Sequence, residues 1–267
     1  MIRDLSQRRM VVTGASSGIG RCLAEQAAQR GARVALVARS AERLDEVALA
    51  IHSAGGEAVA IPADVTSDAD RRRLLQTIVE TFGGLDVLVN NAGVGSFGHF
   101  AESSETILRQ VFEVNFFAPA ELIRLAVPIL KDGRQPAIVN VASMCGRCAL
   151  PAWTEYSASK FALCSLTESL RGELVRYGID VLLVLPGLTS TSLGHHLVRN
   201  EGRMKIDFAA GMKPEAVAAR VLRALERNRP ETIMGRDARL LLALNRFLPR
   251  LVDRLMARKV RRLYAGG

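Results

Sequence analysis

The chain has 267 residues, of which 49% are hydrophobic, 24% charged and 5% aromatic, and its net charge is +9. This composition is typical of a soluble globular protein with an aliphatic core and excludes an intrinsically disordered chain. No apolar run reaches the ~18 residues that a membrane-spanning helix needs, and the first residues, MIRDLSQRR, contain no apolar segment of the kind found in export signals. We therefore expect a cytoplasmic protein.

Short β-rich segments alternate with longer helical segments as far as residue 235. Strands are expected at 10–14, 33–38, 57–64, 86–93, 137–143, 180–186 and 231–235. Helices are expected at 18–30, 41–54, 67–82, 104–115, 117–131, 152–177 and 214–228. Strands that are aliphatic throughout are typical of parallel sheets covered by helices on both faces. The sequence therefore predicts an α/β fold: a single doubly wound, Rossmann-type domain over 1–235 with about seven strands.

The positive charge is concentrated in a C-terminal extension, residues 236–267. This segment contains nine basic and two acidic residues, so it carries +7 of the net charge of +9. The body is nearly neutral and lacks the interleaved cations and aromatic residues of a nucleic-acid groove, so we expect no nucleic-acid partner.

Two helices separated at Pro249 are expected in the C-terminal extension. The second places apolar residues on one face and arginines opposite; the apolar set is Leu251, Val252, Leu255, Met256, Val260, Leu263 and Tyr264. Such a helix can lie on an anionic membrane surface, which indicates peripheral contact with the inner face of a membrane. It can equally pack against its own body or a sister subunit, and the sequence leaves both possibilities open.

A glycine-rich turn, TGASSGIG over residues 13–20, links the first expected strand to the first helix. Glycines at such a turn let the backbone approach a pyrophosphate, and the N–H groups at the start of the helix attract its charge. The glycine spacing differs from the common G-x-G-x-x-G pattern. The turn predicts a nucleotide site by its position.

Arg39 follows the second expected strand, where dinucleotide-binding folds read the adenosine ribose. An acidic residue there binds a free 2′-hydroxyl group, whereas an arginine binds a 2′-phosphate. Because no acid is present, the sequence favours NADP(H) over NAD(H). The alternative is that Arg39 is a solvated arginine at the start of a helix.

Tyr156 and Lys160 share one face of an expected helix, and Ser143 ends the fifth expected strand. A phenol with a pKa near ~10 is a poor proton donor and acceptor at neutral pH, and a nearby ammonium favours the phenolate. A serine hydroxyl at the same place can hold a substrate oxygen beside the phenol. The group predicts a carbonyl reductase or alcohol dehydrogenase in which Lys160 lowers the pKa of Tyr156.

The four cysteines do not indicate a disulfide framework, and Cys145 and Cys148 form a single C-x-x-C pair. A zinc site needs about two further ligands, but His52, His99 and the pair 195–196 fall in separate segments. We expect free thiols and no metal.

Together these motifs resemble the short-chain dehydrogenase/reductase family over about residues 8–235. Further matches are Asp64-Val65, the run 90–93 (Asn-Asn-Ala-Gly), Asn115, and Pro186-Gly187 followed by Thr191. The resemblance implies that Tyr156 is the general acid and base. It also implies that Ser143 orients the substrate carbonyl, Lys160 holds the nicotinamide ribose, and Asn115 positions a water that relays protons to Lys160.

The resemblance also implies a set of cofactor-binding residues. Besides Tyr156 and Lys160, they are Gly14, Ser16, Ser17, Gly18, Ile19, Gly20, Arg39, Asp64, Val65, Asn91, Ala92, Gly93, Pro186, Gly187, Thr189 and Thr191. Thr189 departs from the valine or isoleucine that is usual there, with little expected effect. Asp64 alternatively caps the loop that follows it. The family forms homodimers or homotetramers, so we expect one of these here.

Substrate specificity is expected in the loops 94–103, 144–155 and 188–213, which contain many apolar side chains. The candidate pocket residues are Phe97, Phe100, Met144, Leu150, Trp153, Leu193, Leu197 and Met204. They favour an apolar, lipid-like or steroid-like ketone or alcohol, although such residues also fill core space. The alternative function is a non-catalytic NADP(H)-binding sensor or scaffold; the complete Asn115, Ser143, Tyr156 and Lys160 group favours the enzyme.

Overall fold

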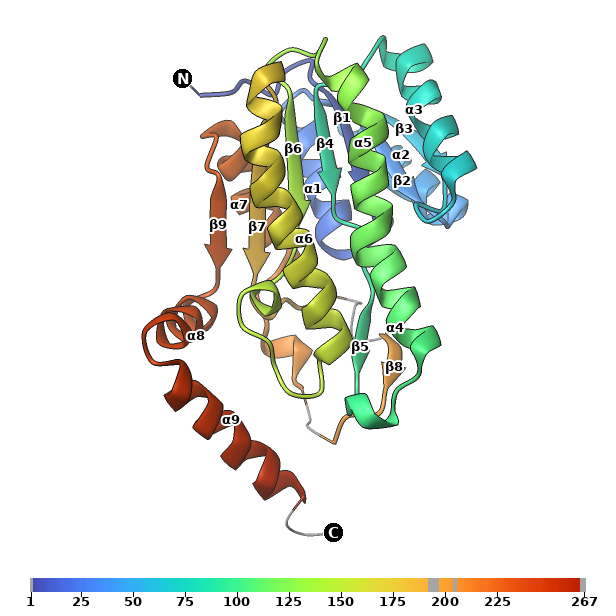
Figure 1. Ribbon diagram of the computed structural model, residues 1–267. Helices are drawn as coiled ribbons and strands as arrows, with labels where there is room; N and C mark the ends of the chain where they lie inside the picture. Colours follow the sequence, from blue (N-terminus) through green and yellow to red (C-terminus); the bar gives the residue numbers. More distant parts are fainter. Residues whose placement is uncertain (1, 192–196, 204–205, 265–267) are drawn as a thin grey trace.

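The computed structural model describes residues 2–191, 197–203 and 206–264. Seven parallel strands form one sheet in the order β3-β2-β1-β4-β6-β7-β9 (Figure 1). Their bounds are β1 Arg9–Thr13, β2 Arg33–Ala38, β3 Glu57–Pro62, β4 Val87–Asn90, β6 Ala137–Val141, β7 Asp180–Pro186 and β9 Glu231–Met234. The order reverses between β1 and β4, and ligands of doubly wound folds bind at the carboxyl ends of the strands flanking this point. The predicted fold class is confirmed.

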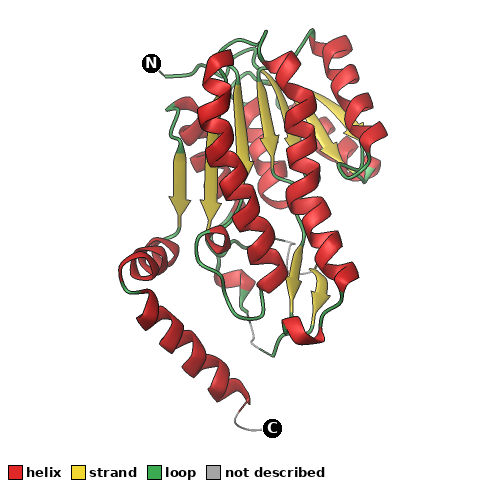
Figure 2. Cartoon of the chain, in the orientation of Figure 1, coloured by secondary structure: helices red, strands yellow, loops and turns green. Residues whose placement is uncertain are grey.

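Helices cover both faces of the sheet (Figure 2). Helices α1 Gly18–Ala28, α2 Ala41–Ser53 and α7 Pro214–Glu226 cover one face, and α3 Asp68–Phe82, α4 Glu105–Phe112, α5 Ala118–Leu130 and α6 Thr154–Glu173 lie on the other side. Neighbouring residues of β1 enter different cores: Met10 packs in one cluster with Leu23 of α1, and Val11 packs in the other with Leu122 of α5. This burial on both faces explains why the strands are apolar throughout.

Helices α4 and α5 are joined by a π-helical turn, Glu113–Phe117. The expectation of two separate helices, 104–115 and 117–131, is therefore wrong at this junction. Pro119 in the first turn of α5 has no N–H group to donate to the preceding turn, and the π-helical turn directly precedes it. The π-turn widens the helix at Asn115, and such turns occur frequently at functional sites.

A second, two-stranded sheet was not predicted. It pairs β5 Gly95–Phe97 with β8 Leu197–Asn200 and lies beyond the lower ends of the main strands in Figure 1. The buried Arg199 guanidinium ties the two segments together, because it donates to the carbonyl oxygen of His99 at 2.7 Å and to Glu201 at 2.6 Å. The short helical turns are η1 Phe100–Glu102, η3 Met144–Gly146, η4 Leu174–Tyr177 and η6 Phe208–Ala210.

The C-terminal extension forms α8 Arg236–Phe247 and α9 Pro249–Tyr264, with the predicted break before Pro249. Val252 of α9 is buried, and α9 contacts α8, whereas Leu251 and Leu255 are 43% and 49% exposed. The expected apolar face of α9 is therefore covered only in part. Within the described ranges, no helix combines the length and the apolar character needed to cross a membrane.

Candidate active site

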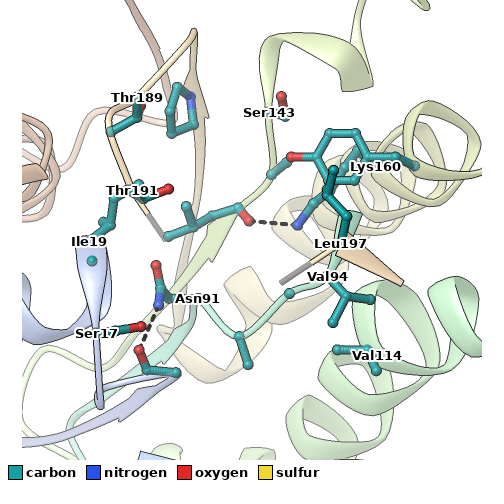
Figure 3. Close-up of a pocket in the computed structure, with 18 of the residues that line it drawn as sticks. Ser17, Ile19, Asn91, Val94, Val114, Ser143, Lys160, Thr189, Thr191 and Leu197 are labelled. Carbon is teal, nitrogen blue, oxygen red and sulfur yellow. Dashed lines mark hydrogen bonds between the residues drawn. The ribbon is translucent and has the colours of Figure 1, made fainter. Parts of the chain in front are cut away.

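A cleft of about 1260 Å³ runs along the carboxyl ends of β1, β2, β4, β6 and β7. It brings together residues from every predicted motif, and Figure 3 shows Ile19 and Thr191 on one side of it and Ser143 and Lys160 on the other. Among the predicted site residues, only Gly20 and Asn115 do not line it. The cleft therefore joins the glycine turn, the strand ends and the Tyr156 helix in one cavity.

The glycine turn fits closely against the loop that follows β4. Gly14 has φ +67°, and a Cβ there would lie 2.9 Å from Nδ2 of Asn91. A Cβ at Gly20 would lie 2.1 Å from the carbonyl oxygen of Gly14, so Gly20 serves the packing of the turn behind the cleft. These contacts bring the start of α1 up to the cavity, where its free N–H groups can bind an anion.

Thr13 connects the two loops and was not predicted as a site residue. Its Oγ1 accepts hydrogen bonds from the backbone N–H groups of Asn91 at 2.9 Å and Ala92 at 3.0 Å. The side chain of Asn91 in turn donates to the carbonyl oxygen of Thr13 at 2.9 Å. Thr13 therefore positions the Asn91-Ala92-Gly93 segment beside the glycine turn.

Two arginines line the end of the cleft beside β2. Arg39 and Arg43 are both exposed, and neither forms an ion pair within the described residues. Arg43 was missed, although its position one helical turn after Arg39 could have indicated it. Asp64 and Val65 line the same end; the carboxylate of Asp64 caps its own loop by accepting from the N–H group of Thr66 at 2.9 Å. In this structure Asp64 therefore caps the loop that follows it, which was the alternative to a contact with adenine.

Ser143, Tyr156 and Lys160 are buried around one point of the cleft. Burial raises the pKa of the Tyr156 phenol, and a hydrogen bond between Tyr156 and Ser143 opposes that rise. Burial also lowers the pKa of Lys160 to about 8. The Lys160 ammonium donates to the carbonyl oxygen of Val141 at 3.2 Å, and its Nζ lies 5.8 Å from the centre of the Tyr156 ring.

The expectation that Lys160 lowers the pKa of Tyr156 is not met in this structure. Both groups lie out of water, and desolvation disfavours the charged form of each. The phenol pKa therefore rises despite the nearby amine, and Ser143 is the group that favours the phenolate.

Asn115 lies behind the cleft and is 1% exposed. Its Oδ1 accepts from the N–H group of Val94, and its Nδ2 donates to the carbonyl oxygen of Val94, both at 2.9 Å. Nδ2 also lies 3.0 Å from Oγ of Ser159 on α6. A Cβ at Gly93 would lie 3.1 Å from Oδ1 of Asn115 and 3.4 Å from Nζ of Lys160. Asn115 thus fixes the loop after β4 against α6.

The far end of the cleft has an apolar lining, as predicted, but a partly different membership. Met144, Leu150, Trp153 and Leu197 line it. The expectation is wrong for Phe97, which is buried behind Trp153 with ring centroids 5.1 Å apart, and for Phe100, which is exposed outside the cleft. Leu193 and Met204 lie outside the described residues. The structure adds Gln110, Glu113, Val114, Leu188, Val198, Ile206, Asp207, Phe208, Ala210 and Lys259.

Of the cysteines, only Cys145 lines the cleft, and its thiol adds to the rise in the pKa of Tyr156. Cys145 and Cys148 are free and buried, and burial raises the pKa of the Cys145 thiol to about 11. Residues 2–191, 197–203 and 206–264 contain no cluster of three or more His, Cys, Asp or Glu side chains that could hold a metal ion. His195 and His196 lie outside the described residues.

Comparison with known proteins settles the family. Residues 8–202 match the sequence profile of the family described as short chain dehydrogenase. This chain belongs to the short-chain dehydrogenase family.

Relatives of this dehydrogenase extend over nearly its whole length. It is 34% identical to the uncharacterized oxidoreductase YxnA of Bacillus subtilis, covering 96% of this chain and 73% of that protein. It is 33% identical to the ketoacyl reductase HetN of a Nostoc species, covering 94% of this chain and 88% of HetN. A crystal structure of a Burkholderia phymatum short-chain dehydrogenase/reductase in complex with NAD superposes with a TM-score of 0.86 at 27% identity, covering 94% of this chain and 96% of that one. The family and its relatives make this protein an oxidoreductase acting on small molecules with a nicotinamide cofactor.

Proposed function

We propose that this dehydrogenase uses NADP(H) to interconvert an apolar ketone and its secondary alcohol. The observation that carries the proposal is one cleft with two unpaired arginines at one end, the Ser143, Tyr156 and Lys160 group in the middle, and an apolar lining at the other end. The alternative is a sensor or scaffold that binds NADP(H) without turnover.

The residues present fit an NADP(H) molecule. The glycine turn leaves a cradle that side chains would fill, at the N-terminus of α1, which favours a pyrophosphate. Arg39 and Arg43 would bind the 2′-phosphate, Asp64 and Val65 the adenine, and the segments 91–93 and 186–191 the nicotinamide end. When bound, the cofactor supplies or accepts the hydride.

Tyr156 is the group that moves the proton. In ketone reduction its phenol Oη donates a proton to the substrate oxygen, and in alcohol oxidation the phenolate takes it back. Burial favours the neutral phenol, which suits proton donation, while the Ser143 hydrogen bond stabilises the phenolate that remains. Ser143 orients the substrate oxygen. The expected role of Asn115, positioning a water beside Lys160, fits the adjacency of the two side chains around Gly93.

Consumption of NADPH with matched ketones tests the function. Long apolar ketones are expected to be reduced faster than short hydrophilic ones. Tyr156→Phe should lower kcat by about 10²- to 10⁴-fold, while the variant still binds NADPH as followed by the fluorescence of Trp153. Binding of NADPH without turnover of any ketone or alcohol would establish the sensor alternative, and full activity of Tyr156→Phe would refute the proton-transfer role.

We also propose that the protein is cytoplasmic and that its C-terminal extension binds peripherally to an anionic membrane. Phe247, Leu248, Leu251 and Leu255 are 76%, 51%, 43% and 49% exposed, and they are interleaved with arginines. Apolar side chains beside cations are the pattern that anionic lipid surfaces bind. Co-sedimentation with anionic vesicles at low salt, absent with neutral vesicles and abolished by Leu251→Glu, is the expected result.

A second copy of the chain is the other possible occupant of this apolar surface. The family's homodimers or homotetramers remain an expectation here. If the protein fails to bind vesicles and Leu251→Glu instead dissociates an oligomer in analytical ultracentrifugation, the membrane proposal is wrong.

A further inference from the structure

Lys259 brings a positive charge from the C-terminal extension to the cleft. It belongs to α9, yet it lines the same cavity as Tyr156. Helices α8 and α9 follow β9, the edge strand opposite β3, and lie on the side of the sheet away from β2, the strand that Arg39 follows (Figure 1). Lys259 therefore lies at the substrate end of the cavity.

The position of Lys259 on α9 follows from the packing of that helix. Val252 is buried, and Met256 and Val260 are half-buried, so these residues mark the inward side of α9. Lys259 lies seven residues after Val252, two helical turns along the same side. Arg258 precedes it on the outer side and does not line the cleft.

The ammonium of Lys259 has no partner in the described part of the chain. It forms no ion pair or hydrogen bond there, and its side chain is exposed. Asp207 is an acid that shares the cleft lining, and its carboxylate already accepts from the N–H groups of Ala209 at 2.9 Å and Ala210 at 3.3 Å. Glu113 lines the cleft from the α4 side. The charge of Lys259 is thus available to a ligand.

We infer that Lys259 binds an anionic group, a carboxylate or a phosphate, at the far end of an apolar carbonyl substrate. This inference rests on the proposed function and specifies its substrate class. The wall of the substrate end is formed by apolar side chains such as Trp153, Leu197 and Phe208. A substrate that reaches both Tyr156 and Lys259 needs its carbonyl at one end, an apolar chain in the middle and an acid at the other end, as in an oxo fatty acid.

The size of the effect follows from the exposure of Lys259. Because water screens an exposed ion pair, its loss is expected to cost ~3- to 10-fold in binding. Lys259 lies away from the reacting carbonyl, so it stabilises the bound substrate and the transition state equally. Its removal should therefore raise KM and leave kcat unchanged.

The test compares an oxo fatty acid with its methyl ester, which differ only in the charge at the far end. With wild-type protein, kcat/KM is expected to be higher for the acid. Lys259→Ala should raise KM for the acid ~3- to 10-fold and change KM for the ester less than ~2-fold. Lys259→Glu should reverse the preference. Arg258→Ala removes the same charge from the outer side of α9 and should leave both substrates unaffected.

Three results would overturn the inference. Equal losses for acid and ester in Lys259→Ala would mean that the residue only packs at the substrate end of the cleft. Equal losses for the acid in Lys259→Ala and Arg258→Ala would mean a general attraction by the basic helix. An unchanged KM for the acid in Lys259→Ala, with the enzyme still turning over both acid and ester, would refute the contact while leaving the proposed function intact.

A binding measurement keeps the inference testable without turnover. Trp153 is the single tryptophan of the chain and lines the same end of the cleft. Its fluorescence reports binding of acid and ester to the NADPH-loaded protein. If neither the acid nor the ester is reduced, the proposed function fails. Weaker binding of the acid by Lys259→Ala than by the wild-type protein would still support the contact. Equal binding of the acid by the two proteins would refute it.

Discussion

Replacing Arg39 with aspartate tests which cofactor the cleft binds. Arg39 lies just before α2 and Arg43 in its first turn, and both are exposed and without an ion pair in the described residues. A guanidinium in this state can place two parallel N–H groups on a phosphate without first breaking another contact. NADPH differs from NADH only by the 2′-phosphate, so the two arginines should act on one cofactor and not on the other.

The magnitude follows from the contacts that Arg39 can make. Hydrogen bonds to a charged group contribute ~1.5–3 kcal/mol, and solvent exposure at this end of the cleft reduces the Coulomb part. A contribution of ~2–3 kcal/mol corresponds to a rise of roughly 30- to 150-fold in the Kd for NADPH. Arg43→Ala should cost less, about 3- to 10-fold. Aspartate at position 39 can accept the ribose hydroxyl groups, so the Kd for NADH should stay the same or fall.

Titration of Trp153 fluorescence with each cofactor measures both constants on one protein. Arg227→Asp is a matched control, because it makes the same charge change at an exposed position outside the cleft. It should leave both constants unchanged. The reasoning is refuted if Arg39→Asp weakens NADPH and NADH by the same factor, or if the wild-type protein binds NADH at least as tightly as NADPH.

Three further predictions concern buried polar groups. Burial lowers the pKa of Lys160 from 10.5 to about 8, so as the pH rises the folded state releases this proton before the unfolded state does. The free energy of unfolding should therefore rise between about pH 8 and pH 10.5. Lys160→Met should remove that rise, as measured by urea titrations at several pH values. Asn115→Leu should lower the melting temperature, since it leaves both backbone groups of Val94 unpaired, and a stability equal to that of the wild type would contradict this. Both carboxylate oxygens of Glu155 are buried without a hydrogen bond in the described structure. Glu155→Met should therefore raise the free energy of unfolding by ~1–3 kcal/mol. A loss of stability would instead show that the carboxylate has a hydrogen-bond partner.

The main sheet could be predicted from the sequence because its strands obey one simple rule. The inner strands are buried on both faces, so an aliphatic run such as 33–38 is sufficient to indicate a strand. The small sheet of β5 and β8 could not be predicted in this way. Its strands have only three and four residues. Their pairing depends on Arg199 and on contacts between segments about a hundred residues apart in the sequence.

The site shows the same division between local and long-range information. The glycine turn and the Tyr156-Lys160 pair are local patterns, and the cleft contains both. Lys259 reaches the cleft only through the path of α8 and α9, which no local pattern gives. The pKa of Tyr156 was predicted in the wrong direction, because the neighbouring ammonium is visible in the sequence and the degree of burial is not.

Buried polar residues between β6 and α6 explain how α6, the helix that carries the proton donor Tyr156, is held in position. Asn140 of β6 donates to Oγ1 of Thr167 on α6 at 2.9 Å and accepts from Asn90 of β4 at 2.8 Å. Three residues beyond Asn140, Ser143 contacts Tyr156, which lies three helical turns before Thr167. Asn140 of β6 and Ser143, two residues after the strand ends, thus fix α6 at two points. The hydrogen bond between Asn140 and Thr167 sets the rotation of α6 in the core. The contact between Ser143 and Tyr156 places the phenol beside the serine hydroxyl. The geometry of the reacting groups therefore depends on a hydrogen bond that is far from the cleft.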